Sequence, residues 1–175
     1  MGIMINKRNG RQEILDITKI QKNTISATEN LVGVSQSELE IDAQIKFIDG
    51  MSSSDIQDAL VKTAVEKIDI DVPNWTFVAA RLFLFDLYHR VGKSTHGIKG
   101  NAYCHLRDYI KCGQEAGRII PGLETDYDLD ELSNYIDPSR DYLFNYLGMK
   151  TLYDRYLLKD NNKNPIELPQ QMFMG

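Results

Sequence analysis

The sequence predicts a mostly helical α+β protein with a small sheet at its N-terminus. Three observations support this fold class. Short runs of apolar and charged residues flank Asn9-Gly10. Apolar residues recur at helical spacing over most of the remaining chain. Residues that favour helix N-caps stand directly before several of these apolar runs.

The first predicted element is an N-terminal hairpin. Residues 3–8 and 11–15 flank Asn9-Gly10, a dipeptide that tolerates the positive φ angles of a two-residue type I′ turn. With this turn, Ile5 faces Ile14 and Lys7 faces Gln12 on one side of the ribbon. The other side carries Asn6, Arg8, Arg11 and Glu13. This register places Lys7 beside an apolar face.

A helix, a short helical turn and a third strand are predicted next. Asp16 is a suitable N-cap for a helix that runs to about Leu31. Its buried stripe consists of Ile17, Ile20, Ala27 and Leu31. Ser35 and Glu38 have the spacing of a capping box, which predicts a helical turn. Apolar and polar residues then alternate over residues 39–47, and this pattern predicts a third strand.

Two longer helices follow a turn at Asp49-Gly50. Three serines at positions 52–54 can cap the first, whose apolar face includes Ile56 and Leu60. Pro73 begins the second, PNWTFVAARLFLFDLYHR, which has no clear polar face. A helix that is apolar nearly all round belongs in the centre of a bundle. Asp86 and Arg90 are spaced for an ion pair near its end.

A domain boundary is predicted in the glycine-rich stretch GKSTHGIKGN. The predicted domains are residues 1–92 and residues 101–175, with a linker over residues 93–100. The second domain again has helical periodicity, with Asp128 and Glu131 as a capping pair and with Pro138 and Pro169 at the starts of further helices. Because the final run LPQQMFMG is still apolar, we expect the chain to be a piece of a longer protein.

Composition limits the classes of function. The formal net charge of −5 argues against a general nucleic-acid binder, because binding to phosphate backbones needs a basic surface. The sequence contains neither a membrane span nor the apolar part of a signal peptide, so a cytoplasmic protein without a membrane partner is expected. Cys104 and Cys112 are expected to be reduced structural thiols. His96 and His105 lack the spacing of a metal site.

A small anionic ligand remains compatible with this acidic chain, because such a ligand needs only a few local cations. The stretch from residue 7 to residue 22 contains Lys7, Arg8, Arg11, Lys19 and Lys22 with only two acids. A solvated charged surface is the alternative interpretation, and composition alone favours it.

Three segments in order carry a family resemblance. They are KRNGRQEILDITKI from Lys7, FIDGMSSSDIQDALVKTA from Phe47, and RLFLFDLYHR, which ends at Arg90. Together they resemble the ATP cone, a small nucleotide-sensing domain at the N-terminus of many ribonucleotide reductases. The later segments YIDPSRDYLFNYLGMKTLYDRYLLKD and PQQMFM are similar to the helical region between the cone and the catalytic barrel of aerobic, class I large subunits.

The resemblance implies a helical bundle capped by a three-stranded sheet, with a nucleotide between the hairpin and the helices. Lys7 and Arg8 would contact phosphates, and Ser53 stands where the family usually has a threonine near them. His89 stands where a lysine that contacts a phosphate is common. Either His89 or Arg90 could make this phosphate contact here, and the sequence leaves the choice open. The nucleotide-binding residues implied are Lys7, Arg8, Glu13, Ile14, Leu15, Asp16, Ile17, Thr18, Lys19, Ile20, Phe47, Ser53 and His89.

The function implied by the resemblance is allosteric. The effector is ATP or dATP, with Mg²⁺, and the parent enzyme reduces ribonucleoside diphosphates to deoxyribonucleotides for DNA synthesis. The implied partners are the rest of the large subunit and the small radical-generating subunit, and a homo-oligomer stays open. The chain alone ends before the catalytic barrel and is expected to be non-catalytic. The alternative is a degenerate cone that serves only as a structural or subunit-interaction domain.

Overall fold

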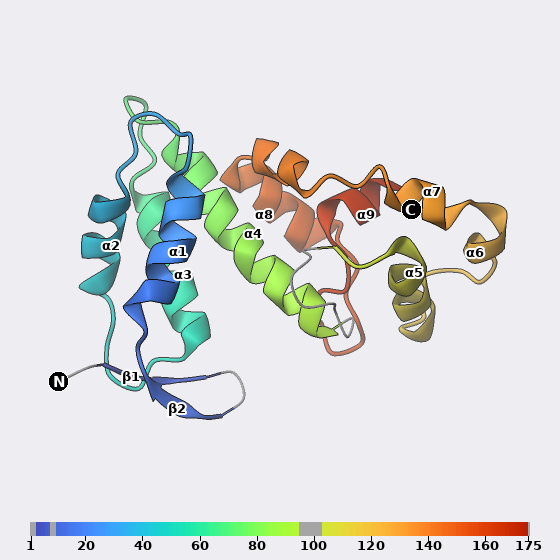
Figure 1. Cartoon of the computed structure of the whole chain (residues 1–175), viewed down its shortest axis with the longest axis horizontal. Helices are drawn as coiled ribbons and strands as arrows, with labels where there is room; N and C mark the ends of the chain where they lie inside the picture. Colours follow the sequence, from blue (N-terminus) through green and yellow to red (C-terminus); the bar gives the residue numbers. More distant parts are fainter. Residues whose placement is uncertain (1–2, 8–9, 95–102, 175) are drawn as a thin grey trace. The chain divides into compact units, whose positions relative to one another are not determined.

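The computed structural model describes residues 3–7, 10–94 and 103–174 (Figure 1). They form two compact units: Met1–Phe83 with Phe144–Leu147, and Leu84–Leu143 with Gly148–Gly175. Helices predominate, and the described residues contain one antiparallel sheet of two strands. The predicted fold class, α+β and mostly helical, is confirmed. Most of the predicted linker, and His96 within it, lies outside the described residues.

The hairpin forms, but its register differs from the predicted one. β1 (Met4–Asn6) pairs with β2 (Gln12–Ile14), and Ile5 lies opposite Glu13 instead of Ile14. Side chains alternate between the two faces of a strand, so a shift of one residue moves a whole strand's side chains to the other face. The prediction that placed Glu13 on the face opposite Ile5 and Lys7 is therefore wrong.

The turn explains the difference in register. The Lys7 amide donates to the Arg11 carbonyl at 2.7 Å, and the Gly10 amide donates to the Lys7 carbonyl at 2.8 Å. These bonds enclose a three-residue loop, and Gly10 ends it with a φ angle of +82°. A loop of this length needs a left-handed residue at its last position, which glycine adopts without steric cost. Gly10 was thus correctly identified as a turn residue, but the predicted two-residue turn is wrong.

Helix α1 (Ile17–Thr28) begins at its predicted N-cap, since Asp16 accepts a hydrogen bond from the Thr18 amide at 3.0 Å. It ends before the predicted boundary at Leu31, because Glu29 leaves the helical conformation. The predicted stripe is also shifted: Ile17 is 53% exposed, whereas Thr24 is fully buried.

The predicted third strand is wrong, because this segment is helical. α2 spans Gln36–Gln44 and begins at the N-cap Ser35. Leu39 and Ala43 lie four residues apart and are fully buried, whereas Ile41 between them is 60% exposed. Residues four apart share a helix face. The alternating pattern therefore places apolar residues on two faces of a helix, and only one of these faces joins the core.

Helix α3 (Ser53–Glu66) begins beside the hairpin. Ser52 and Asp55 form a capping box, in which each side chain accepts a hydrogen bond from the other's backbone amide. Ser52 also forms an isolated parallel bridge with Asn6. The backbone N–H of Asn6 donates to the Met51 carbonyl at 2.9 Å. Figure 1 shows the hairpin at one end of α1 and α3. The first residue of α3 is thereby brought close to β1.

Lys67, at the C-terminal end of α3, forms ion pairs with α2. Its ammonium lies 2.6 Å from Glu38 Oε1 and 2.5 Å from Asp42 Oδ2, and it stands 5.4 Å from the centre of the Trp75 ring. Burial alone would lower the pKa of Lys67, but the hydrogen bonds to Asp42 and Glu38 raise it above its ordinary value of 10.5. The ammonium is therefore held charged between two carboxylates.

Helix α4 (Trp75–Ser94) is the long apolar helix predicted after Pro73. Trp75 is 2% exposed, and the helix contributes several fully buried leucines and alanines to the core. The predicted ion pair forms, with Arg90 Nε 2.9 Å from Asp86 Oδ2. Among the helices of the described ranges, none is both long enough and apolar enough to cross a membrane.

The second unit is built from short helices. They are α5 (Leu106–Glu115), α6 (Leu123–Asp126), α7 (Leu129–Ser133), a 3₁₀ helix (Pro138–Leu143), α8 (Tyr146–Arg155), which begins in the first unit, and α9 (Pro169–Met174). Asp128 caps α7 as predicted, and Leu106, Tyr109, Ile110 and Leu129 form a core between α5 and α7.

A buried carboxylate connects separate segments of this unit. Asp141 is 2% exposed and accepts hydrogen bonds from Tyr88 at 2.7 Å, Tyr103 at 2.6 Å and Gln170 at 2.9 Å. Burial raises the pKa of Asp141 although these three bonds oppose the rise. Because every partner is another side chain of the core, we interpret this network as structural.

Candidate functional site

A small cavity lies in the first unit, where the hairpin, α1 and the start of α3 meet. Its volume is about 130 Å³. It is lined by Ile5, Lys7, Glu13, Leu15, Asp16, Lys19, Ile20, Asn23, Ser53, Ile56, Gln57 and Leu60. Charged, amide and hydroxyl groups thus share one cavity with apolar side chains, a combination typical of sites for small polar ligands.

Two lysines in this cavity share one carboxylate oxygen. Glu13 Oε1 lies 2.9 Å from Lys7 Nζ and 3.7 Å from Lys19 Nζ. The observed hairpin register makes this possible, because it places Glu13 and Lys7 on the same face of the ribbon. The hydrogen bond from Lys7 holds the pKa of the Glu13 carboxyl below its ordinary value of 4.5. Glu13 is therefore ionised at neutral pH.

Asp16 combines capping with an ion pair. One carboxylate oxygen accepts hydrogen bonds from the amide and the hydroxyl of Thr18, at 3.0 and 2.5 Å. The other lies 3.5 Å from Lys19 Nζ. The hydrogen bond from the Thr18 hydroxyl is the main cause that lowers the pKa of Asp16. Asp16 thus fixes the start of α1 and orients Lys19 at the same time.

Two polar side chains of the cavity, those of Ser53 and Asn23, make no hydrogen bond to any other residue of the described ranges. The side chain of Gln57 already has one protein partner, since its amide nitrogen donates to the Leu82 carbonyl at 2.8 Å. Ser53 is also the first residue of a helix of 14 residues, where backbone amides and the helix dipole favour an anion. These groups are available to a ligand.

More than half of the predicted site residues lie together in this cavity. They are Lys7, Glu13, Leu15, Asp16, Lys19, Ile20 and Ser53. Residues from the hairpin, from the start of α1 and from the start of α3 thus meet, although more than thirty residues of sequence separate Ile20 from Ser53.

The structure places the other predicted residues elsewhere. Ile14 and Ile17 are 64% and 53% exposed, and Phe47 is buried in the core at 9% exposure. Thr18 binds Asp16 at the helix cap. His89 is exposed on α4, in the second unit. Arg8 lies outside the described residues.

Sequence reasoning missed five lining residues: Ile5, Asn23, Ile56, Gln57 and Leu60. For the two amides a signal was present, because Asn23 follows Lys19 by four residues and Gln57 follows Ser53 by four. Residues at this spacing lie on the same helix face. Extending each predicted contact by one helical turn would have found both.

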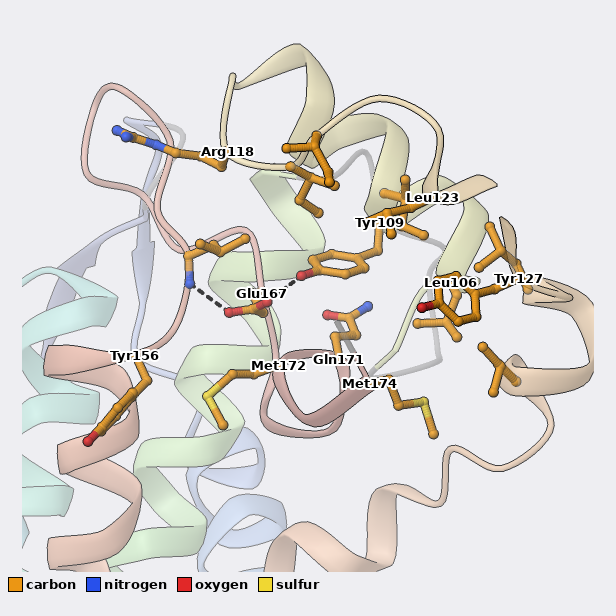
Figure 2. A pocket seen from close by; sticks show the side chains of 16 residues that line it. Leu106, Tyr109, Arg118, Leu123, Tyr127, Tyr156, Glu167, Gln171, Met172 and Met174 are labelled. Carbon is orange, nitrogen blue, oxygen red and sulfur yellow. Dashed lines mark hydrogen bonds between the residues drawn. The ribbon is translucent and has the colours of Figure 1, made fainter. Parts of the chain in front are cut away.

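A larger cavity of about 570 Å³ lies in the second unit (Figure 2). Its carboxylate already has partners: Glu167 accepts hydrogen bonds from the Tyr109 hydroxyl and from the Leu158 amide, the latter at 2.7 Å. Arg118, the one cation among the described lining residues, donates to the Lys159 carbonyl at 3.0 Å. This mostly apolar cavity therefore lacks the clustered cations that a phosphate requires, and we favour the smaller cavity as the functional site.

Comparison with protein families separates the two cavities. The family model described as the ATP cone domain matches residues 3–90, about half of the chain. The chain belongs to the ATP cone family. Every lining residue of the smaller cavity falls inside the cone match, and every lining residue of the larger one falls outside it. The model described as the all-alpha domain of ribonucleotide reductase matches residues 142–175.

Curated relatives agree with both family matches. The chain is 60% identical to the ribonucleoside-diphosphate reductase subunit alpha of Helicobacter pylori, over 99% of this chain and 21% of that protein. It is 31% identical to the subunit of the same name from Haemophilus influenzae, over 91% of this chain and 21% of that protein. It is 29% identical to reductase 1 subunit alpha of Escherichia coli, over 91% and 20%. The chain therefore spans about a fifth of the length of these relatives and corresponds to the N-terminal region of a reductase large subunit.

Proposed function

We propose that this chain is an allosteric module that binds ATP or dATP in the cavity of its cone. One observation carries the proposal: Lys7, Lys19 and Ser53 converge in a single cavity within the cone match. A triphosphate carries several negative charges and needs clustered cations and donors. The cone family and the chemistry of the lining thus support the same class of ligand.

In the proposed arrangement the phosphates meet Lys7, Lys19 and the N-terminus of α3 at Ser53. The base and ribose then lie against Leu15 and Ile20, with the carboxylates nearby. A cavity of about 130 Å³ holds only part of a nucleotide, so the remainder extends beyond it. We assign Mg²⁺ to the phosphates, because this ion usually keeps several waters and binds few carboxylates. The described residues contain no group of three or more typical metal ligands.

The sequence left open whether His89 or Arg90 replaces the lysine that is common in this family. Arg90 already pairs with Asp86 at 2.9 Å and donates to the Tyr153 hydroxyl at 3.0 Å. These bonds weaken the case for Arg90 as a phosphate ligand. We therefore retain His89, together with Arg8, as the candidates to be tested by substitution.

We propose that residues 1–92 form the regulatory cone, that residues 93–100 connect it to the following helices, and that the parent protein is a reductase large subunit in the cytoplasm. ATP would permit and dATP suppress its activity by binding unequally to different assemblies with the small subunit or with further copies. The chain alone would not reduce nucleotides. Burial raises the pKa of the Cys104 and Cys112 thiols, which favours a structural role for both.

Calorimetric titration of the purified chain with ATP and dATP, each with Mg²⁺, tests the proposal. Saturable binding is expected to raise the melting temperature, by an amount equivalent to about 2.7 kcal/mol at a hundredfold excess over the dissociation constant. Lys150→Ala is a matched control, because it removes a cation of the second unit that pairs with Asp154. If millimolar nucleotide produces neither heat nor a melting shift, the rival interpretation of a purely structural cone is favoured.

A further inference from the structure

The charge balance of the cone cavity bears on how a nucleotide enters it. Among its described lining residues, the cations are Lys7 and Lys19, and the acids are Glu13 and Asp16. The cavity is therefore neutral in sum although it contains two ammonium groups. An anionic ligand that needs these cations has to compete with carboxylates that already hold them.

Glu13 is the main competitor. A single oxygen of its carboxylate contacts both lysines, at 2.9 and 3.7 Å, whereas Asp16 reaches only Lys19. Asp16 is also committed to the helix cap through Thr18. Glu13 has no such second role, and its position between two ammonium groups is where a phosphate oxygen would have to lie.

We propose that Glu13 is a built-in competitor that holds Lys7 and Lys19 until the phosphates of a nucleotide displace it. This inference rests on the proposed nucleotide site and assigns Glu13 a role other than contact with base or ribose. Side-chain exposures of 29% for Lys7, 40% for Glu13 and 62% for Lys19 leave these ion pairs open to solvent. Exposed ion pairs are weak, so a polyanion can exchange with the carboxylate.

The proposal explains how an acidic cone can select for charge. A ligand with one negative charge replaces Glu13 without gain, because one anion is exchanged for another. A triphosphate brings several charges and can engage both lysines, with Ser53 and the amides at the start of α3 as further donors. Affinity is therefore expected to rise from adenosine monophosphate to triphosphate in the wild-type chain, and both ligands should bind more tightly when Glu13 is neutral.

The test is Glu13→Gln, which keeps the size of the side chain and removes its charge. Inorganic tripolyphosphate is the main probe, because it has neither base nor ribose. We expect this variant to bind tripolyphosphate about tenfold more tightly than wild type, equivalent to about 1.4 kcal/mol. Glu29→Gln is the matched control, since it removes an exposed acid just after α1 and outside the cavity lining. It should leave tripolyphosphate affinity unchanged.

The outcomes are distinguishable. If Glu13→Gln lowers ATP affinity and leaves tripolyphosphate affinity unchanged, Glu13 contacts the nucleoside and the proposal is overturned. If both Gln variants tighten binding equally, only net charge matters and the proposal again fails. Absence of ATP binding to the wild-type chain would instead refute the nucleotide site itself. The ATP affinity of Glu13→Ala gives a second measurement, which should exceed that of the wild-type chain.

Discussion

Lys7→Ala is the substitution that best separates nucleotide binding from folding. Lys7 is the cation of the hairpin that lines the cone cavity, and its ammonium lies 2.9 Å from Glu13 Oε1. Charge-assisted hydrogen bonds contribute roughly 1.5 to 3 kcal/mol, so loss of a phosphate contact should weaken ATP binding by about ten- to a hundredfold. Loss of the lysine also leaves Glu13 less compensated, which acts in the same direction.

The apo protein should be affected much less. The two side chains of the Lys7–Glu13 pair are 29% and 40% exposed, and exposed pairs contribute about 0 to 1 kcal/mol. For a chain of this length, 1 kcal/mol corresponds to a melting shift of roughly 2 to 4 °C. Calorimetric titration gives the affinity, and thermal unfolding without nucleotide gives the stability. Lys22→Ala is the matched control, because Lys22 is an exposed cation of α1 outside the cavity lining.

Two results would refute this reasoning. Unchanged ATP affinity in Lys7→Ala would remove Lys7 from the binding site. A loss of apo stability as large as the loss of binding free energy would show that Lys7 has a structural role. The double variant Lys7→Ala with Glu13→Gln adds a check: if the carboxylate competes for the lysines, this variant should recover part of the lost affinity.

Three further predictions concern stability. Lys67→Met should lower the free energy of unfolding by about 1 to 2 kcal/mol, because two half-exposed carboxylates of α2 lose their shared partner. Since the folded pKa of Lys67 is raised, this contribution is present below pH 10.5 and is lost as pH rises further; a wild-type stability curve that stays flat there would contradict it. Gly113→Ala should cost about 1 to 3 kcal/mol in urea unfolding, because an added Cβ would lie 2.3 Å from Ile119 Cδ1 and 3.2 Å from its Cβ; an unchanged midpoint would show that Ile119 moves freely. Burial raises the folded pKa of Asp141 and Glu167, so their contribution should stabilise the second unit as pH falls from 7 toward their ordinary values of 3.8 and 4.5, and Asp141→Asn should reduce this dependence in circular dichroism melts.

Local chemistry made the starts of helices predictable. Asp16, Ser52 and Asp128 each accept backbone hydrogen bonds at the N-terminus of a helix, as their position before an apolar run indicates. A cap acts within three residues, so no knowledge of distant contacts is needed. The same holds for Pro169, which begins α9 at the predicted residue.

Features that depend on distant contacts were not predictable in this way. The alternation in residues 39–47 fits a strand, but Leu39 and Ala43 are buried on one face of a helix while Ile41 stays exposed. An apolar pattern states which residues can be buried and not which partner buries them. The hairpin register was not predictable from the turn residue either. Loops of two and of three residues can both end at Gly10, and each loop length gives a different register.

The candidate site was predictable from the sequence only in part. The basic stretch and the family motif pointed to Lys7, Lys19 and Ser53, which do lie in one cavity. The pairing of Glu13 with both lysines could not be foreseen, because it requires the face of the strand that only the observed register provides. Asn23 was missed because no motif marked it, although its spacing from Lys19 places it one helical turn further along α1.

The position of Trp75 provides an optical label for the cone. It is the single tryptophan of the chain, is 2% exposed, and belongs to the first unit. Burial raises the pKa of Tyr88, Tyr103 and Tyr109 of the second unit, so phenolate absorbance from these three rings at high pH reports unfolding there. Indole emission and phenolate absorbance can therefore be recorded on one sample without any attached dye. Comparison of the two signals would show whether a nucleotide that stabilises the cone against unfolding also changes the stability of the second unit.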